Sequence, residues 1–167
     1  MGCLLHPVCA RGLIARQGQG GKVPGLGDFA GEWRVTRRIA DRAGGQCLRF
    51  SGRAAFAWRG AALAYSETGL LHLPGRPAMQ AERHYLWRAE GGRIVVEHAD
   101  GRAFHAFDPA APEAEHLCPP DTYRVVYRFA RWPCWSALWT VTGPRKDYTM
   151  LTRFTPLPSA PDRTGSS

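Results

Sequence analysis

The densest group of chemically capable side chains lies between residues 105 and 123 and comprises His105, His116, Cys118, Asp121 and Tyr123. His116 and Cys118 are two residues apart, so on a strand they project from the same face. A Cys–His pair can act as a nucleophile and its base, with Asp121 orienting the imidazole. The same residues can instead form an internal hydrogen-bond network. Their spacing leaves both interpretations open.

A second candidate group lies on two neighbouring predicted strands. Glu67 lies on one of them, and Arg83 and Tyr85 share a face of the next. If both faces point inward, Glu67 and Arg83 are candidates for a buried ion pair, because a lone buried charge costs several kcal/mol. The alternative is that Arg83 offers its planar guanidinium to a ligand carboxylate or phosphate.

Three further residues are candidates for contacts with a ligand. Lys146 and Tyr148 follow a Gly143-Pro144 turn, and Lys146 is one of only two lysines in a chain otherwise rich in arginine. Trp139 shares a strand face with Trp135, so the two indoles form either core or the wall of a ligand cavity.

Cofactor chemistry has little support in the pattern. The five cysteines are an odd number, and no CxxC or HxxxH spacing occurs, so we predict reduced thiols in a cytoplasmic protein and no bound metal or other cofactor. A haem-binding barrel stays an alternative, because an inward histidine could ligate the iron. Cys118-Pro119 is also a Cys-Pro sequence of the kind in which a cysteine thiolate ligates haem iron.

Composition narrows the class of protein. The 167 residues carry a net charge of +8, but no basic cluster stands out, so we expect no nucleic-acid partner. No window approaches 18 uninterrupted apolar residues, so we expect no membrane span. The oligomeric state is left open.

The elements that must position these residues are strands. From residue 28 to 156 apolar residues alternate with polar ones, and turn-forming glycines separate the runs. Eight to ten sequential antiparallel strands leave long edges unless the sheet closes, which predicts an all-β, up-and-down antiparallel barrel. A two-sheet sandwich is the alternative. We expect a flexible leader over residues 1–27, a disordered tail over 157–167, and a short helix near residues 26–30 or 112–115.

The opening Gly31-x-Trp33 resembles the first motif of the calycin superfamily, which includes the lipocalins. In those families an arginine of the last strand covers the tryptophan, a role that the resemblance would give to Arg153. Residues 28–156 more closely resemble domain-of-unknown-function family 6314 (DUF6314), a bacterial and fungal family. That resemblance implies a lipocalin-like barrel and no activity. Its matching stretches are Gly31-x-Trp33, Tyr65-x-Glu67-x-Gly69, Arg83-His84-Tyr85-x-Trp87, Asp100-Gly101-Arg102-x-Phe104-His105, His116-x-Cys118-x-x-Asp121-x-Tyr123 and Gly143-Pro144-x-Lys146-Asp147-Tyr148.

The sequence therefore predicts a barrel that binds a small apolar or acidic molecule. A small enzyme using the Cys, His, Asp and Tyr cluster is the alternative function. The predicted ligand-binding residues are Glu67, Arg83, Tyr85, His105, His116, Cys118, Asp121, Tyr123, Trp139, Lys146 and Tyr148.

Overall fold

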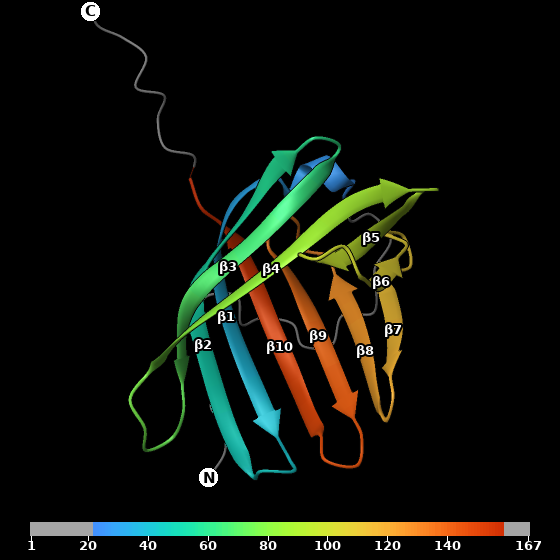
Figure 1. Cartoon of the computed structure of the whole chain (residues 1–167). Coiled ribbons are helices and arrows are strands. Elements are labelled where there is room, and N and C mark those ends of the chain that lie inside the picture. The colour runs from blue at the N-terminus through green and yellow to red at the C-terminus, as the bar shows by residue number, and fades with distance from the viewer. Residues whose placement is uncertain (1–21, 159–167) are drawn as a thin grey trace, which may run out of the picture.

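A computed structural model describes residues 22–158 as one ten-stranded antiparallel sheet that wraps into a nearly closed barrel (Figure 1). A short 3₁₀ helix, η1 (Leu26–Phe29), precedes the strands. The strands are β1 (Gly31–Asp41), β2 (Gln46–Arg59), β3 (Ala62–His72), β4 (Met79–Glu90), β5 (Arg93–His98), β6 (Ala103–Phe107), β7 (Glu113–Cys118), β8 (Asp121–Arg128), β9 (Trp135–Thr142) and β10 (Asp147–Pro156). The all-β, up-and-down prediction is confirmed, and the sandwich alternative is wrong.

The order around the barrel is β6-β5-β4-β3-β2-β1-β10-β9-β8-β7. Every ladder joins neighbours in sequence except the one between β1 and β10, which pairs Trp33 with Pro156. Strands β6 and β7 lie side by side at a seam without a ladder. An isolated bridge between Asp108 and Ala111 spans the turn that connects them.

Glycines form the tight turns that the sequence predicts. Gly45, Gly60, Gly75 and Gly91 have φ angles between +56° and +68°, a left-handed conformation in which other residues are strained. These turns reverse the chain within a few residues, so each strand pairs with the one before it.

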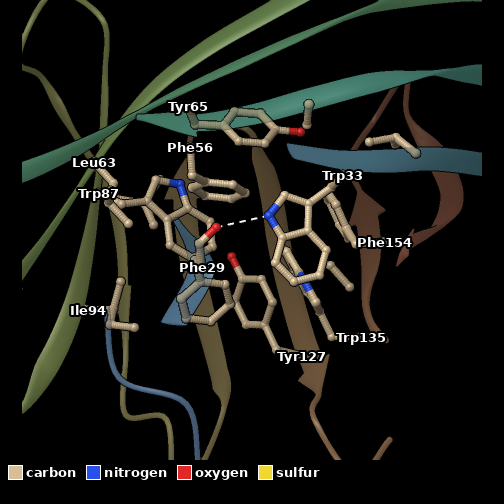
Figure 2. Close-up of a cluster of buried hydrophobic side chains, with 14 of the residues drawn as sticks. Phe29, Trp33, Phe56, Leu63, Tyr65, Trp87, Ile94, Tyr127, Trp135 and Phe154 are labelled. Atoms are coloured by element: carbon tan, nitrogen blue, oxygen red, sulfur yellow. Dashed lines mark hydrogen bonds between the residues drawn. The ribbon is translucent and has the colours of Figure 1, made fainter. Parts of the chain in front are cut away.

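An aromatic plug closes one barrel end. Phe29 of η1 is fully buried, and its ring centroid lies 5.2–5.9 Å from those of Phe56, Trp87, Phe129, Trp132 and Trp135. Figure 2 shows Phe29, Phe56, Trp87 and Trp135 of this cluster. The indole nitrogen of Trp33 donates to the Phe29 carbonyl over 2.9 Å. Burying each such ring contributes about 1.5–3 kcal/mol, so this end is packed shut.

Arg153 does not cover Trp33, contrary to the expectation from the calycins. It alternates with the buried Thr152 and Phe154, so its side chain lies on the outer face of β10. Trp33 packs instead against the rings of Trp132 and Trp135, with centroids 5.8 and 6.0 Å away.

The boundaries also differ in detail from the sequence-based ones. Residues 22–27, assigned to the leader, include the buried Pro24 and Leu26, and the amide of Leu157 donates to the Glu32 carbonyl over 2.8 Å. The helix near residues 26–30 is present as η1, whereas residues 113–115 belong to strand β7. The rest of the predicted leader and tail lies outside the described residues. No helix within residues 22–158 is long and apolar enough to cross a membrane.

Candidate functional site

A cavity of about 250 Å³ lies inside the barrel, below the aromatic plug. Its walls come from inward-facing positions of strands β1, β3, β4, β5, β6, β8, β9 and β10. The residues that line it are Arg37, Tyr65, Arg83, Tyr85, Trp87, Val96, Phe104, His105, Tyr123, Tyr127, Trp135, Ala137, Trp139, Val141, Tyr148, Met150, Thr152 and Phe154.

Flat aromatic rings form one wall of the cavity. The ring of Phe104 stacks on Tyr85 with centroids 5.7 Å apart and on Trp139 with centroids 5.4 Å apart. A register shift between β5 and β6 pairs Val96 with His105 but Glu97 with Ala103. Phe104 is the extra residue of this bulge, which explains why Phe104 and its neighbour His105 both reach the cavity.

The innermost part of the cavity, here the inner pole, consists of Trp87, His105, Tyr127 and Trp135 (Figure 2 shows three of these rings). Nε2 of His105 and the hydroxyl of Tyr127 share a hydrogen bond of 2.7 Å. Burial lowers the pKa of His105 from 6.5 to about 3, so its imidazole is neutral near pH 7.

Within residues 22–158, three nitrogen atoms of the inner pole have no hydrogen-bond partner: Nε1 of Trp87, Nδ1 of His105 and Nε1 of Trp135. Most buried polar atoms in folded proteins are paired. All three belong to residues that line the cavity, and each nitrogen atom is itself buried.

The predicted ion pair between Glu67 and Arg83 is wrong. Glu67 and Arg83 are opposite each other in the β3–β4 register, but the Glu67 carboxylate accepts two bonds from Arg37 of β1, at 2.8 and 2.6 Å. The Tyr65 hydroxyl donates to the same carboxylate over 2.6 Å, and Arg37 Nε donates to Thr152 over 2.8 Å. The guanidinium fork of Arg37 occupies both carboxylate oxygens, so Arg83 is left without this partner.

Arg83 lines the cavity and is half-buried. Its neighbours Glu82 and His84 are exposed and face outward, as strand parity requires. Its one hydrogen-bond contact among the described residues is the sulfur of Met150, 3.9 Å away. This guanidinium is therefore available to an anion in the cavity.

The barrel end opposite η1, here the mouth, carries a polar cluster on the β7–β8 and β9–β10 turns. Lys146 Nζ lies 2.6 Å from an Asp121 carboxylate oxygen and donates to the Tyr123 hydroxyl over 2.8 Å. The bond to Asp121 raises the pKa of Lys146 well above its usual value. Tyr148 lies beside this cluster, and burial raises the pKa of its hydroxyl. Lys146 thereby ties the two turns together.

His116 and Cys118 do not line the cavity. Cys118 is exposed, whereas His116 is half-buried on β7, with its ring 5.3 Å from that of Phe104 across the seam. Within residues 22–158 no hydrogen bond joins these two side chains, and Asp121 is engaged by Lys146. The geometry thus does not assemble the nucleophile that the sequence suggested.

Of the predicted site residues, the structure brings six to the cavity wall: Arg83, Tyr85, His105, Tyr123, Trp139 and Tyr148. Glu67 lies behind the wall, and Asp121 and Lys146 lie at the mouth. Sequence reasoning missed Arg37, Trp87 and Tyr127 as cavity residues. The alternation of side chains along a strand could have identified them, because each lies on the same face of its strand as buried core residues. Within the described chain no group of three or more His, Cys, Asp or Glu side chains could hold a metal ion.

The chain matches one protein family in sequence and resembles a solved structure in fold. The model of a family described as a family of unknown function (DUF6314) matches residues 29–156. Among solved structures, the S-type phycobiliprotein lyase CPES from Guillardia theta superposes with a TM-score of 0.61 at 8% identity, over 81% of this chain and 92% of that one. At this identity the likeness shows a shared fold. No curated protein matches the sequence.

Proposed function

We propose that this chain, which belongs to the DUF6314 family of unknown function, binds one small organic molecule inside its barrel. The observation that carries the proposal is an aromatic cavity of about 250 Å³ whose wall includes Arg83, a guanidinium with no ion-pair partner among the described residues.

The rest of the lining indicates a ligand that is apolar with an acidic group. The stacked rings of Tyr85, Phe104 and Trp139 suit a flat apolar body. Arg83 supplies a cation with no carboxylate partner within residues 22–158, which suits a ligand carboxylate or phosphate. Tyr123 and Tyr148 add hydroxyl groups near the mouth.

The fold comparison supports a small-molecule role for the interior, because a solved barrel of this shape is named a phycobiliprotein lyase. The cavity of about 250 Å³ lies just below the usual range of about 300–1,000 Å³ for ligand pockets. This volume favours a molecule of one or two rings over a macrocycle such as haem.

No specific contact among the described residues supports either alternative function, an enzyme with a Cys118 nucleophile or a haem-binding barrel. A Cys118 nucleophile would have to act from an exposed position outside the cavity. The histidine on the cavity wall is His105, whose Nε2 already bonds to Tyr127.

The test compares native with denaturing mass spectrometry of the purified full chain and adds calorimetric titration with 2-naphthoate, a flat two-ring acid. We expect a retained small molecule, or saturable binding of 2-naphthoate that is tighter than that of its methyl ester. Arg83→Met should remove the preference for the acid, whereas Arg34→Met, on the exposed outer face of β1, should not. Absence of both a retained mass and any saturable binding would overturn the proposal.

A further inference from the structure

We infer that the outer face of strands β2, β1 and β10 binds the phosphate backbone of double-stranded DNA. The inference concerns the outside of the barrel, so it goes beyond the proposed function and does not rest on it. The binding surface, here the arginine block, consists of three outward-facing positions on each of these three neighbouring strands (Figure 1).

The strand registers arrange the arginine block in three rows. In the order β2, β1, β10 the rows are Arg53-Arg34-Thr155, Ser51-Thr36-Arg153 and Arg49-Arg38-Leu151. These positions alternate with buried inward positions such as Val35, Ala54 and Phe154, so they face outward. Glu32 lies just beyond the block on β1. The block itself holds five arginines, three hydroxyl side chains, one leucine and no carboxylate.

Most of these charges have no partner within the described part of the chain. Between residues 22 and 158 the side chains of Arg34, Arg49, Arg53 and Arg153 make no ion pair or hydrogen bond. Arg34 and Arg53 are direct cross-strand neighbours, as are Arg38 and Arg49. Like charges in such positions destabilise a sheet, and an anionic partner removes this repulsion.

The uncharged side chains of the block favour phosphate over other anionic partners. Arginine together with Ser and Thr hydroxyls is a side-chain set that binds phosphate oxygens in nucleic-acid complexes. The centre of a protein interface is rich in aromatic residues instead, and binding to a membrane surface buries apolar side chains. The block has no aromatic residue, and its one apolar side chain, Leu151, is already half-buried.

The same composition selects the form of nucleic acid. Proteins that hold single strands without sequence preference stack the bases on aromatic side chains, which the block does not offer. Proteins that select duplex RNA contact its 2′-hydroxyl groups in the minor groove, and a block made only of strand residues has no loop to reach them. Duplex DNA presents one phosphate charge per about 1.7 Å of its axis. The block extends about 13 Å along β1, from Arg34 to Arg38, so its five arginines can reach about four phosphates.

The fold changes the sequence-based expectation about nucleic acid. The expectation of no such partner rested on the absence of a basic cluster along the chain. The five arginines lie far apart in sequence and meet only across the β1–β2 and β1–β10 ladders. A basic face of this kind is the usual electrostatic feature of a surface that binds DNA.

The experiment measures binding of the full chain to duplexes of about 20 base pairs by fluorescence anisotropy, over roughly 50 to 200 mM NaCl. Two duplexes of unrelated sequence should bind with equal affinity, with a Kd of at most about 100 μM at physiological salt. A plot of the logarithm of the association constant against that of the salt concentration should have a slope of about −4, as four neutralised phosphates give.

A matched pair of double variants locates the effect. Arg34→Gln with Arg53→Gln should weaken binding about tenfold or more and make the salt slope shallower by about two. The control, Arg59→Gln with Arg145→Gln, removes the same charge from exposed arginines outside the block and should change both quantities little. Because Arg34 and Arg53 repel each other, their replacement should not lower the melting temperature. A melting temperature at or above that of the unmodified protein separates lost contacts from lost folding.

Several outcomes would overturn the inference. One is no saturable binding of either duplex at the lowest salt concentration. Another is an equal loss of affinity in the control, which would assign binding to the net charge of the whole chain. Tighter binding of a single strand, of duplex RNA, of phosphatidylserine vesicles or of poly-glutamate would assign the face to a different partner. If the first double variant does not fold, Arg38→Gln with Arg49→Gln removes the other facing pair and takes its place.

Discussion

The buried pair of Arg37 and Glu67 allows a sharp test of how the barrel interior is stabilised. Glu67 is 1% exposed, and its carboxylate accepts both guanidinium bonds of Arg37 and one from Tyr65. Arg37→Met leaves this carboxylate buried with the Tyr65 hydroxyl alone. We expect a loss of about 3–5 kcal/mol in the free energy of unfolding, as for other buried pairs that lose one partner. Urea denaturation would show it as a fall of about 2 M in the midpoint.

Two controls accompany this substitution. Arg37→Met combined with Glu67→Leu should recover much of the loss, because no buried charge then lacks a partner. Arg83→Met should cost less than about 1 kcal/mol, since Arg83 has no ion-pair partner among the described residues and is half-buried. A small effect of Arg37→Met, or an equal effect of Arg83→Met, would refute the assignment of Arg37 as the partner of Glu67.

Three further predictions concern the cavity and its mouth. Because burial lowers the pKa of His105 to about 3, the unfolded chain binds more protons below pH 6.5. The free energy of unfolding should then fall as the pH drops from 6.5, by at most about 1.4 kcal/mol per unit, and His105→Gln should remove this part of the slope in urea unfolding at pH 7, 6 and 5. Gly143→Ala would place its Cβ 1.9 Å from an Asp121 oxygen, so thermal unfolding should show a loss of about 1–3 kcal/mol; an unchanged melting temperature would contradict that contact. Cys118→Ser should leave the 2-naphthoate affinity unchanged in calorimetry, because Cys118 is exposed outside the cavity; a loss of binding would return Cys118 to the site.

The strands could be predicted because the physics that forms them is local. Trp33, Val35 and Ile39 alternate with polar residues, and glycines such as Gly45 and Gly91 meet the positive φ of tight turns. Both the alternation of apolar with polar residues and the turn glycines can be read directly from the sequence. The strands and the nearly closed barrel follow from them.

The partners across the barrel could not be predicted in the same way. Parity places Glu67 and Arg83 on inward faces, but it does not reveal that Arg37, 30 residues before Glu67, reaches the carboxylate first. Parity also fails at the bulge, where consecutive residues Phe104 and His105 share the cavity. The shape of the site depends on these non-local contacts and on one irregular pair of strands.

The seam between β6 and β7 makes the barrel a natural candidate for circular permutation. Pro156 of β10 pairs with Trp33 of β1, and Leu157 bonds to Glu32, so the two ends of the described barrel lie together. A linker joining residue 158 to residue 22, with a new start at the turn after β6, would make the order along the chain the order around the barrel. Every ladder would then be local, and the lower contact order should speed folding while leaving the cavity walls intact.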